Sequence, residues 1–199
     1  MSGARGCHIT TSGYHHGNLR RAIIDAALEA IGENGPTGWS LRGLARRAGV
    51  SHAAPIHHFR DKTGLLTAIA AEGYELFADA LERAADDFLE VGVAYVRFAI
   101  THRPYVLVMF RPELYRADDP QVAAARERAA AVLRSGARAL APDAAQERAF
   151  TLGAWSAVHG FAELWLNGAL AESVEGEAES LARTMLQAIF LRGSRDGAS

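Results

Sequence analysis

The 199-residue sequence contains only one cysteine and one lysine, Cys7 and Lys62. A single cysteine excludes disulfides within the chain and metal sites built from several thiolates. No stretch approaches the roughly 18 consecutive apolar residues of a membrane-spanning helix, and residues 1–16 lack the apolar segment of a secretory signal. We therefore expect a cytoplasmic protein that does not enter a membrane.

Sustained alternation of apolar and polar residues, the pattern of β-strands, is also missing. Alanine-rich segments with helical periodicity instead alternate with glycine or proline breaks, and the hydrophobic content of 49% supports a substantial core. The sequence therefore predicts an all-α protein without internal repeats. The expected helices cover about 19–34, 41–48, 52–59, 62–88, 91–101, 104–110, 120–140, 143–170 and 177–191.

Residues 40–59, SLRGLARRAGVSHAAPIHHF, have the spacing of a helix-turn-helix. Gly49 can adopt a positive φ where the first helix ends, and Ser51 can cap the second helix. The first helix is amphipathic, with an apolar side and a cationic side, because Arg42, Arg46 and Arg47 lie outside its apolar stripe. That stripe consists of Leu41, Leu44, Ala45 and Ala48.

The second helix of this unit is a candidate for reading DNA. It carries short or planar side chains that can enter a major groove about 12 Å wide. Pro55 is comfortable only within a first helical turn, so we expect a short or slightly distorted helix. Two amphipathic helices around a glycine corner are also an ordinary packing unit, and the pattern alone leaves that alternative open.

Charge is distributed unevenly along the chain. Residues 1–62 carry 8 Lys and Arg against 4 Asp and Glu, whereas the remainder carries 13 against 19. The net charge of −2 therefore conceals a basic front of +4 and an acidic remainder of −6. Six of the eight histidines also lie in the first 62 residues, where they can add positive charge near a polyanion. We expect the front of the chain to bind double-stranded DNA.

These features resemble the tetracycline-repressor (TetR) family of bacterial one-component regulators, and the likeness covers the full chain. Residues 14–66, YHHGNLRRAIIDAALEAIGENGPTGWSLRGLARRAGVSHAAPIHHFRDKTGLL, are similar to the three-helix DNA-binding domain of the family and the start of its fourth helix. The motif WSAVHGF at 155–161 is similar to a subgroup whose ligand-binding domain is named for a Trp, a His and a Gly.

The resemblance implies a domain organisation and a function. A flexible arm at 1–17 precedes a helix-turn-helix domain at 18–62, and a helical-bundle ligand-binding and dimerisation domain at 63–193 precedes a tail at 194–199. The implied protein is a homodimeric regulator, in the family usually a repressor that binds a palindromic operator and is released by an unknown small-molecule effector. Activation by the ligand is the less common outcome in the family, and the sequence does not decide between the two. Neither a cofactor nor a metal is expected.

The expected DNA contacts combine the residue pattern with the resemblance. They are Arg42, Ser51, His52, Ala54, His57, His58 and Lys62. Lys62 matches a phosphate-contacting lysine of the family, and His58 with Phe59 matches the end of its recognition helix. Where the family usually has a tyrosine that contacts phosphate, this chain has Ile56. This departure predicts weaker binding or a greater dependence on His57 and His58.

The helix predicted at 143–170 is uncharged on two opposite sides, so both sides must be buried. Trp155, Val158 and His159 share one side, and smaller residues occupy the other. A second copy of the chain is the simplest way to cover that small side. The expected dimer interface comprises Gly153, Ala157, Gly160, Leu164, Leu181, Met185 and Ala188.

The other side of this helix is expected to face a small-molecule pocket with aromatic walls and a few polar groups. The candidate residues are His102, Tyr105, Met109, Phe110, Trp155 and His159. A lone histidine on an apolar face is more often a hydrogen-bonded core residue, and Met109 and Phe110 also suit a core. The prediction therefore depends mainly on the family resemblance.

Two other classes of protein compete with a regulator. An enzyme could use His159 with Glu163, but two ligands fall short of a metal site, and no nucleophile–base pattern or phosphate-binding glycine loop is present. An architectural DNA-binding protein would share the basic front but would bind all sequences alike. We therefore expect a regulator that is not an enzyme.

Overall fold

The computed structural model describes residues 12–141, 143–170 and 177–191, and every regular element within them is helical. The α-helices are α1 (Ser12–Asn34), α2 (Leu41–Arg47), α3 (Ala54–Phe59), α4 (Lys62–Glu82), α5 (Phe88–Thr101), α6 (Arg103–Met109), α7 (Pro120–Leu140), α8 (Ala144–Leu166) and α9 (Ala178–Leu186). A short 3-10 helix, η1 (Pro112–Leu114), follows α6, and a π-helical turn, η2 (Gln187–Leu191), continues α9.

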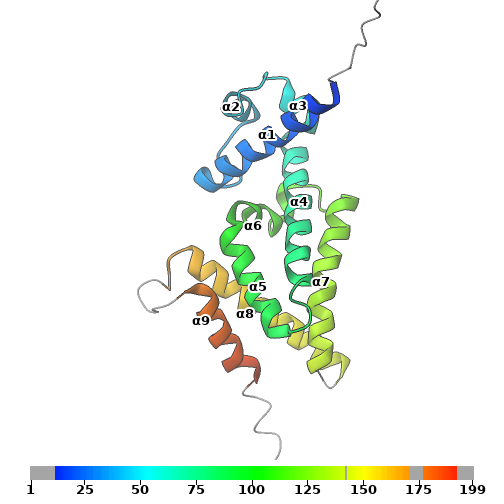
Figure 1. Ribbon diagram of the computed structural model, residues 1–199, viewed down its shortest axis with the longest axis vertical. Coiled ribbons are helices and arrows are strands. Elements are labelled where there is room, and N and C mark those ends of the chain that lie inside the picture. The colour runs from blue at the N-terminus through cyan, green and yellow to red at the C-terminus, as the bar shows by residue number, and fades with distance from the viewer. Residues whose placement is uncertain (1–11, 142, 171–176, 192–199) are drawn as a thin grey trace, which may run out of the picture.

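Figure 1 shows the molecule as a small three-helix unit, α1 to α3, at one end of a larger bundle formed by α4 to α9. Helix α4 joins the two parts, because it begins at the small unit and runs down the bundle beside α7. Helix α5 packs against both α8 and α9, and α6 contacts α1. The small unit therefore rests on the bundle through α4 and α6.

Helix α1 begins at Ser12, seven residues before the expected start at about residue 19. The boundary placed after residue 17 therefore falls inside a helix. The first turns escaped the sequence analysis because residues 12–18, SGYHHGN, carry no apolar stripe. The helix ends as expected before Gly35, which adopts a φ of 73°. Its expected inward residues Ile23, Ala27 and Ile31 are fully buried.

The helix-turn-helix forms with one difference in its capping. Ser40 caps α2 by accepting a hydrogen bond from Gly43 N at 3.2 Å, and Gly49 turns the chain with a φ of 66°. The expected cap at Ser51 is wrong: α3 begins later, its N-cap is Ala53, and no side chain caps it. Pro55 lies in the first turn of α3, which is only six residues long, so the expectation of a short helix is confirmed.

Helix α4 is capped by Asp61, whose carboxylate accepts a hydrogen bond from Gly64 N at 2.6 Å. The apolar residues that recur at helical spacing along it are all buried: Leu65, Leu66, Ile69, Tyr74, Phe77 and Leu81. The helix ends at Glu82 instead of near 88, because Asp87 caps a new helix by accepting from Leu89 N at 2.8 Å. The alanine-rich linker obscured this break in the sequence.

The remaining helices lie close to their expected ranges. Helix α7 spans Pro120–Leu140 as predicted, and Asp143 caps α8 through Ala145 N and Gln146 N. Helix α8 ends at Leu166, before Gly168 with a φ of 74°. The last predicted helix is divided into α9 and the π-helical η2. No helix among the described residues is long and apolar enough to cross a membrane.

Candidate DNA interface and ligand cavity

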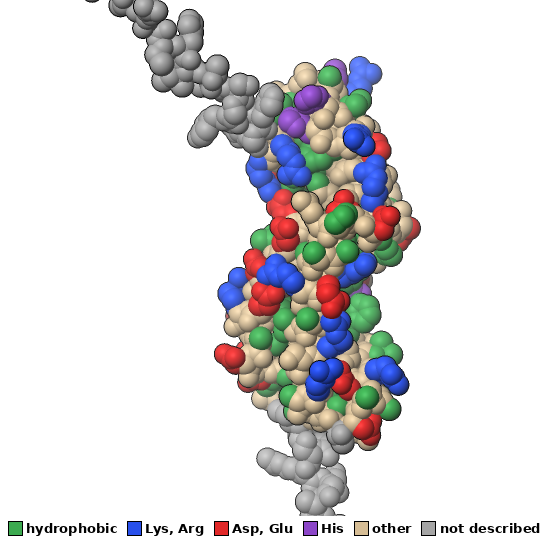
Figure 2. Space-filling model, turned by 90° about the vertical axis from the view of Figure 1, so that its right-hand side faces the viewer, with side chains coloured by type: hydrophobic (Ala, Val, Ile, Leu, Met, Phe, Trp, Pro, Cys, Tyr) green, Lys and Arg blue, Asp and Glu red, His purple; other side chains and the backbone are tan. Residues whose placement is uncertain are grey.

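The exposed surface of the helix-turn-helix carries most of the residues expected to contact DNA. Arg42, Ser51, His52 and His57 are exposed, whereas His58 is half-buried beside Phe59. Ile56, which replaces the usual tyrosine of the family, is 58% exposed on α3. Figure 2 shows histidine side chains gathered at the end of the molecule formed by α1 to α3, with basic side chains beside them. A cationic surface that can donate hydrogen bonds therefore covers this end.

Ala54 is an exception to the expected DNA surface. Its side chain is 6% exposed and packs into the core of the three-helix unit, as does the neighbouring Pro55. A residue at the first position of α3 that faces inward cannot reach a base edge, so the predicted contact by Ala54 is wrong. The helix was predicted to begin at residue 52, two residues before the actual start of α3, and this error changed which side of the helix Ala54 was expected to face.

Lys62 has a structural role that the sequence analysis did not predict. Its ammonium donates hydrogen bonds to Thr37 O at 3.0 Å and Trp39 O at 2.9 Å, and it lies 4.0 Å from the centroid of the Trp39 ring. Burial lowers the pKa of Lys62. An ammonium has three protons, so one is left for a phosphate. Lys62 thus fastens the α1–α2 loop to the start of α4.

The arginines of α2 differ in their surroundings. Arg47 pairs with Glu33 at 2.6 Å and with Glu29 at 3.7 Å, which ties α2 to α1 and uses its charge within the protein. Arg42 and Arg46 are exposed and have no carboxylate partner in the described part of the chain. These two guanidinium groups therefore remain available for phosphates.

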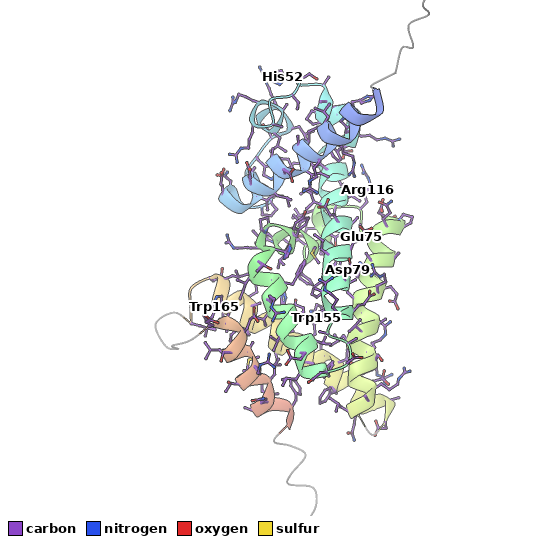
Figure 3. The ribbon with its side chains drawn as sticks, viewed as in Figure 1. His52, Glu75, Asp79, Arg116, Trp155 and Trp165 are labelled. Carbon is purple, nitrogen blue, oxygen red and sulfur yellow. The ribbon has the colours of Figure 1, made fainter. Side chains whose placement is uncertain are left out.

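Polar contacts on α4 reinforce the junction between the three-helix unit and the bundle. Glu72 of α4 accepts hydrogen bonds from Arg21 of α1 and from the Tyr105 hydroxyl of α6, each at 2.5 Å. Arg116, which lies beside α4 in Figure 3, pairs with Asp61 at 2.9 Å, and its backbone N–H donates to Thr67 Oγ1 at 3.1 Å. A movement of α6, or of the segment before α7, would therefore also displace side chains on α1 and α4.

The bundle encloses a cavity of about 1030 Å³ between α4, α5, α7 and α8. Three of the six expected pocket residues line it: Met109, Phe110 and Trp155. Figure 3 shows Trp155 among the bundle helices, and Trp165 lies farther along α8 towards α9. Trp155 is also 42% exposed, so part of its indole lies at the surface. The cavity has the size and largely apolar walls of a small-molecule site.

The three expected histidine and tyrosine contacts do not line the cavity. His159 lies behind the wall, where its Nδ1 is 2.8 Å from the Tyr95 hydroxyl and its ring packs edge-on against Phe110. His102 stacks on Phe98 at the α5–α6 junction. Tyr105 turns towards Glu72 instead. The prediction that these three side chains contact a ligand is wrong: Phe98 and Glu72 hold His102 and Tyr105 away from the cavity, and His159 lies behind Tyr95 and Phe110, which form the wall.

Much of the cavity wall was not predicted from the sequence. Missed lining residues include Tyr74, Phe77, Phe88, Tyr95, Tyr115, Arg126, Arg134 and Phe190. Tyr74 and Phe77 belong to the buried apolar stripe of α4, and the same stripe lines the cavity. Periodicity identifies the buried face of a helix but does not distinguish a filled core from a hollow one.

Hydrogen bonds occupy the tyrosine hydroxyls of the wall. Tyr74 and Tyr115 both donate to Met109 O at 2.8 Å, which holds the end of α6 against α4. The Tyr95 hydroxyl is engaged with His159. Burial raises the pKa of both Tyr74 and Tyr95, so both hydroxyls stay protonated at neutral pH. These tyrosines therefore contribute mainly their rings to the wall, because their hydroxyls are already hydrogen-bonded within the protein.

The small side of α8 is open in the single chain. A Cβ atom added at Gly153 or Gly160 would meet nothing within 4 Å. Exposed apolar side chains lie nearby along α8 and η2, with Leu152 60%, Leu164 49% and Ile189 51% exposed. Such exposure on adjacent elements is typical of a surface that another protein chain covers.

The comparisons with known proteins agree with this architecture. Residues 23–69 match the family model for bacterial regulatory proteins of the tetR family, and residues 88–189 match the model for the tetracyclin repressor-like C-terminal domain. Over 62 residues the chain is 47% identical to the HTH-type transcriptional regulator BetI of Escherichia coli, a match that spans 31% of this chain and 32% of the relative. The chain thus aligns with about a third of the length of these curated relatives.

Two solved structures extend the likeness to most of the chain. A protein of unknown function from Rhodococcus sp. RHA1 is 33% identical, covers 92% of this chain and 98% of its own, and superposes with a TM-score of 0.73. AibR in complex with isovaleryl coenzyme A and operator DNA is 22% identical, covers 86% and 98%, and has a TM-score of 0.60. The C-terminal match covers about half of the chain and follows the DNA-binding match, so the protein belongs to the TetR family of transcriptional regulators, which is not a family of enzymes.

Proposed function

We propose that the protein is a ligand-responsive repressor, which binds a palindromic operator as a homodimer in the cytoplasm and leaves it when a small molecule fills the cavity. The observation that carries this proposal is the course of α4, which begins directly after the recognition helix α3 and continues into the cavity wall. A ligand that prefers one position of α4 over another shifts α3 with it.

The DNA-binding part of the proposal rests on exposed residues of two helices. His52 and His57 lie at the tip of the helix-turn-helix, where their rings can reach base edges in the major groove. Arg42 and Arg46 on α2 contact phosphates, which fix the register without reading sequence. Two such units related by a two-fold axis read half-sites about 34–36 Å apart.

The effector part rests on the cavity and on one structural relative. AibR was solved with both isovaleryl coenzyme A and operator DNA, which supports a small organic effector for a cavity in the same fold. We also place the chain in the Trp-His-Gly subgroup, because Trp155 lines the cavity and His159 holds Tyr95 in its wall. Release requires that the effector prefer the arrangement that does not fit the operator.

A fluorescence-anisotropy titration tests the DNA-binding function. The DNA upstream of the gene should bind at least roughly 10³-fold more tightly than a scrambled duplex, and the affinity should fall steeply with salt. Equal affinity for both duplexes would instead identify an architectural DNA-binding protein. Binding to neither would contradict the proposal.

A further inference from the structure

The cavity wall formed by α7 has one charged group without a carboxylate partner. Arg126 lines the cavity and forms no ion pair with the described residues. Burial raises the pKa of Tyr74, and the positive charge of Arg126 opposes this increase, so the guanidinium lies close enough to act on that hydroxyl. The neighbouring arginine Arg128 is already paired, at 2.7 Å with Asp79 and 2.6 Å with Glu82.

A continuous stripe of α7 extends from Arg126 along the cavity. Ala130 and Leu133 follow at i+4 and i+7, on the same face of the helix, and both line the cavity. Arg134 lies one position farther, roughly 12 Å along the axis from Arg126 at 1.5 Å per residue. This face of α7 therefore begins at the guanidinium of Arg126, which has no ion-pair partner among the described residues, and continues with the apolar residues Ala130 and Leu133.

The opposite end of the cavity has a different charge. Asp86 and Asp87 line it there, and Asp87 is occupied as the cap of α5. Arg134 at this end is paired with Glu127. Aromatic side chains of α5 and η2, Phe88 and Phe190, also line the cavity. An anionic group is thus attracted to the Arg126 end, and an apolar body fits the rest.

We propose that the effector of this cavity is an amphiphilic carboxylate, with its carboxylate on the Arg126 guanidinium and its hydrocarbon body along Ala130 and Leu133. This inference rests on the proposed function and specifies the chemical class of the ligand. An arginine fork matches the two oxygens of a carboxylate, and burying the tail removes apolar surface from water. The hydroxyls of Tyr74, Tyr95 and Tyr115 are already occupied, so they do not compete for the head group.

Three ten-carbon probes test this inference: decanoate, decanamide and decylamine, measured by isothermal titration calorimetry at neutral pH. They share a chain of ten carbons, including the carbonyl carbon of the first two, and differ in the charge of the head. We expect decanoate to bind at least tenfold more tightly than decanamide, and decylamine to bind most weakly. Stronger binding of decylamine, equal binding of all three, or binding of none would overturn the proposal.

Variants at the two ends of the α7 stripe provide the matched comparison. Arg126→Gln should remove the preference for decanoate over decanamide, whereas Arg126→Lys should keep part of it. Arg134→Gln, which also lines the cavity but loses an existing ion pair, should keep the preference. Arg126 is exposed, so its replacement should leave the fold intact, as circular dichroism can verify. A preference that persists in Arg126→Gln would overturn the assignment of the head group.

Operator binding measured in parallel separates this inference from the proposed function. One outcome is that decanoate binds with a preference that depends on Arg126 and yet leaves the operator complex intact. That result would support the carboxylate site but contradict the proposal that the effector releases the protein from its operator. Operator release by decylamine but not by decanoate would leave the repressor function standing and refute the carboxylate site.

Discussion

Lys62, the single lysine of the chain, acts on both stability and DNA binding. Lys62→Met keeps an apolar stem against Trp39 but loses the donors to Thr37 O and Trp39 O. We expect a loss of about 1–2 kcal/mol in the free energy of unfolding, measured with urea. Arg42→Ala is the control, because this exposed side chain should change stability by less than about 0.5 kcal/mol. If both variants are equally stable, the contacts of Lys62 do not hold the loop.

His57 separates base reading from phosphate binding. Its ring is exposed on α3, so His57→Ala should weaken operator binding more than binding to a random duplex and change the preferred base pairs. Arg42→Ala should weaken binding to both duplexes about equally. Anisotropy titrations with the two duplexes measure the ratio. An unchanged ratio in His57→Ala would show that this histidine does not read bases.

Gly136 makes room for an aromatic residue of the cavity wall. A Cβ atom at this position would lie 2.1 Å from the ring of Phe88, so Gly136→Ala must displace that ring. We expect a loss of about 1–3 kcal/mol in the free energy of unfolding, together with weaker binding of any cavity ligand. Gly32→Ala is the control: its added Cβ would be 3.6 Å from Pro104, and the helix should gain about 0.5–1 kcal/mol. Equal effects of the two variants would show that the Phe88 ring moves freely.

At the scale of elements, α6 is one of the contacts through which the bundle touches α1. Tyr105→Phe removes the hydrogen bond to Glu72 while Arg21 keeps its own. We expect faster hydrogen exchange of backbone amides in α1, with little change in α8, because α1 loses one of its supports. Arg97→Gln, which breaks the pair with Glu179 between α5 and α9, should leave α1 unchanged. Identical exchange in α1 for both variants would show that Tyr105 does not support it.

Helix boundaries could be predicted where a polar cap coincides with an apolar stripe. Asp61 before Leu65 and Leu66, and Asp143 before α8, show this combination, and each carboxylate caps its helix in the structure. The start of α1 could not be predicted because its first turns have no stripe. The break before Phe88 was hidden because alanine suits both a helix and a turn.

The cavity was only partly predictable for a related reason. The sequence placed Trp155 and Phe110 on inward faces, and both line it. Tyr105 and His102 share the same local pattern, but their directions depend on partners distant in sequence, such as Glu72, or on a stacking neighbour, Phe98. A residue pattern carries no information about which of two buried neighbours a side chain will face.

At the scale of the whole molecule, the open side of α8 is the proposed place where two copies meet. Gly160→Leu adds a bulky side chain where the single chain has free space, so the subunit should fold normally but lose close approach to its partner. We expect monomers in sizing chromatography and the loss of most operator affinity, since one half-site replaces two. Ala131→Leu, on the exposed side of α7, should remain dimeric and serves as the control. A Gly160→Leu variant that stays dimeric and keeps its operator affinity would place the interface elsewhere, and α8 would then need another reason for its exposed leucines.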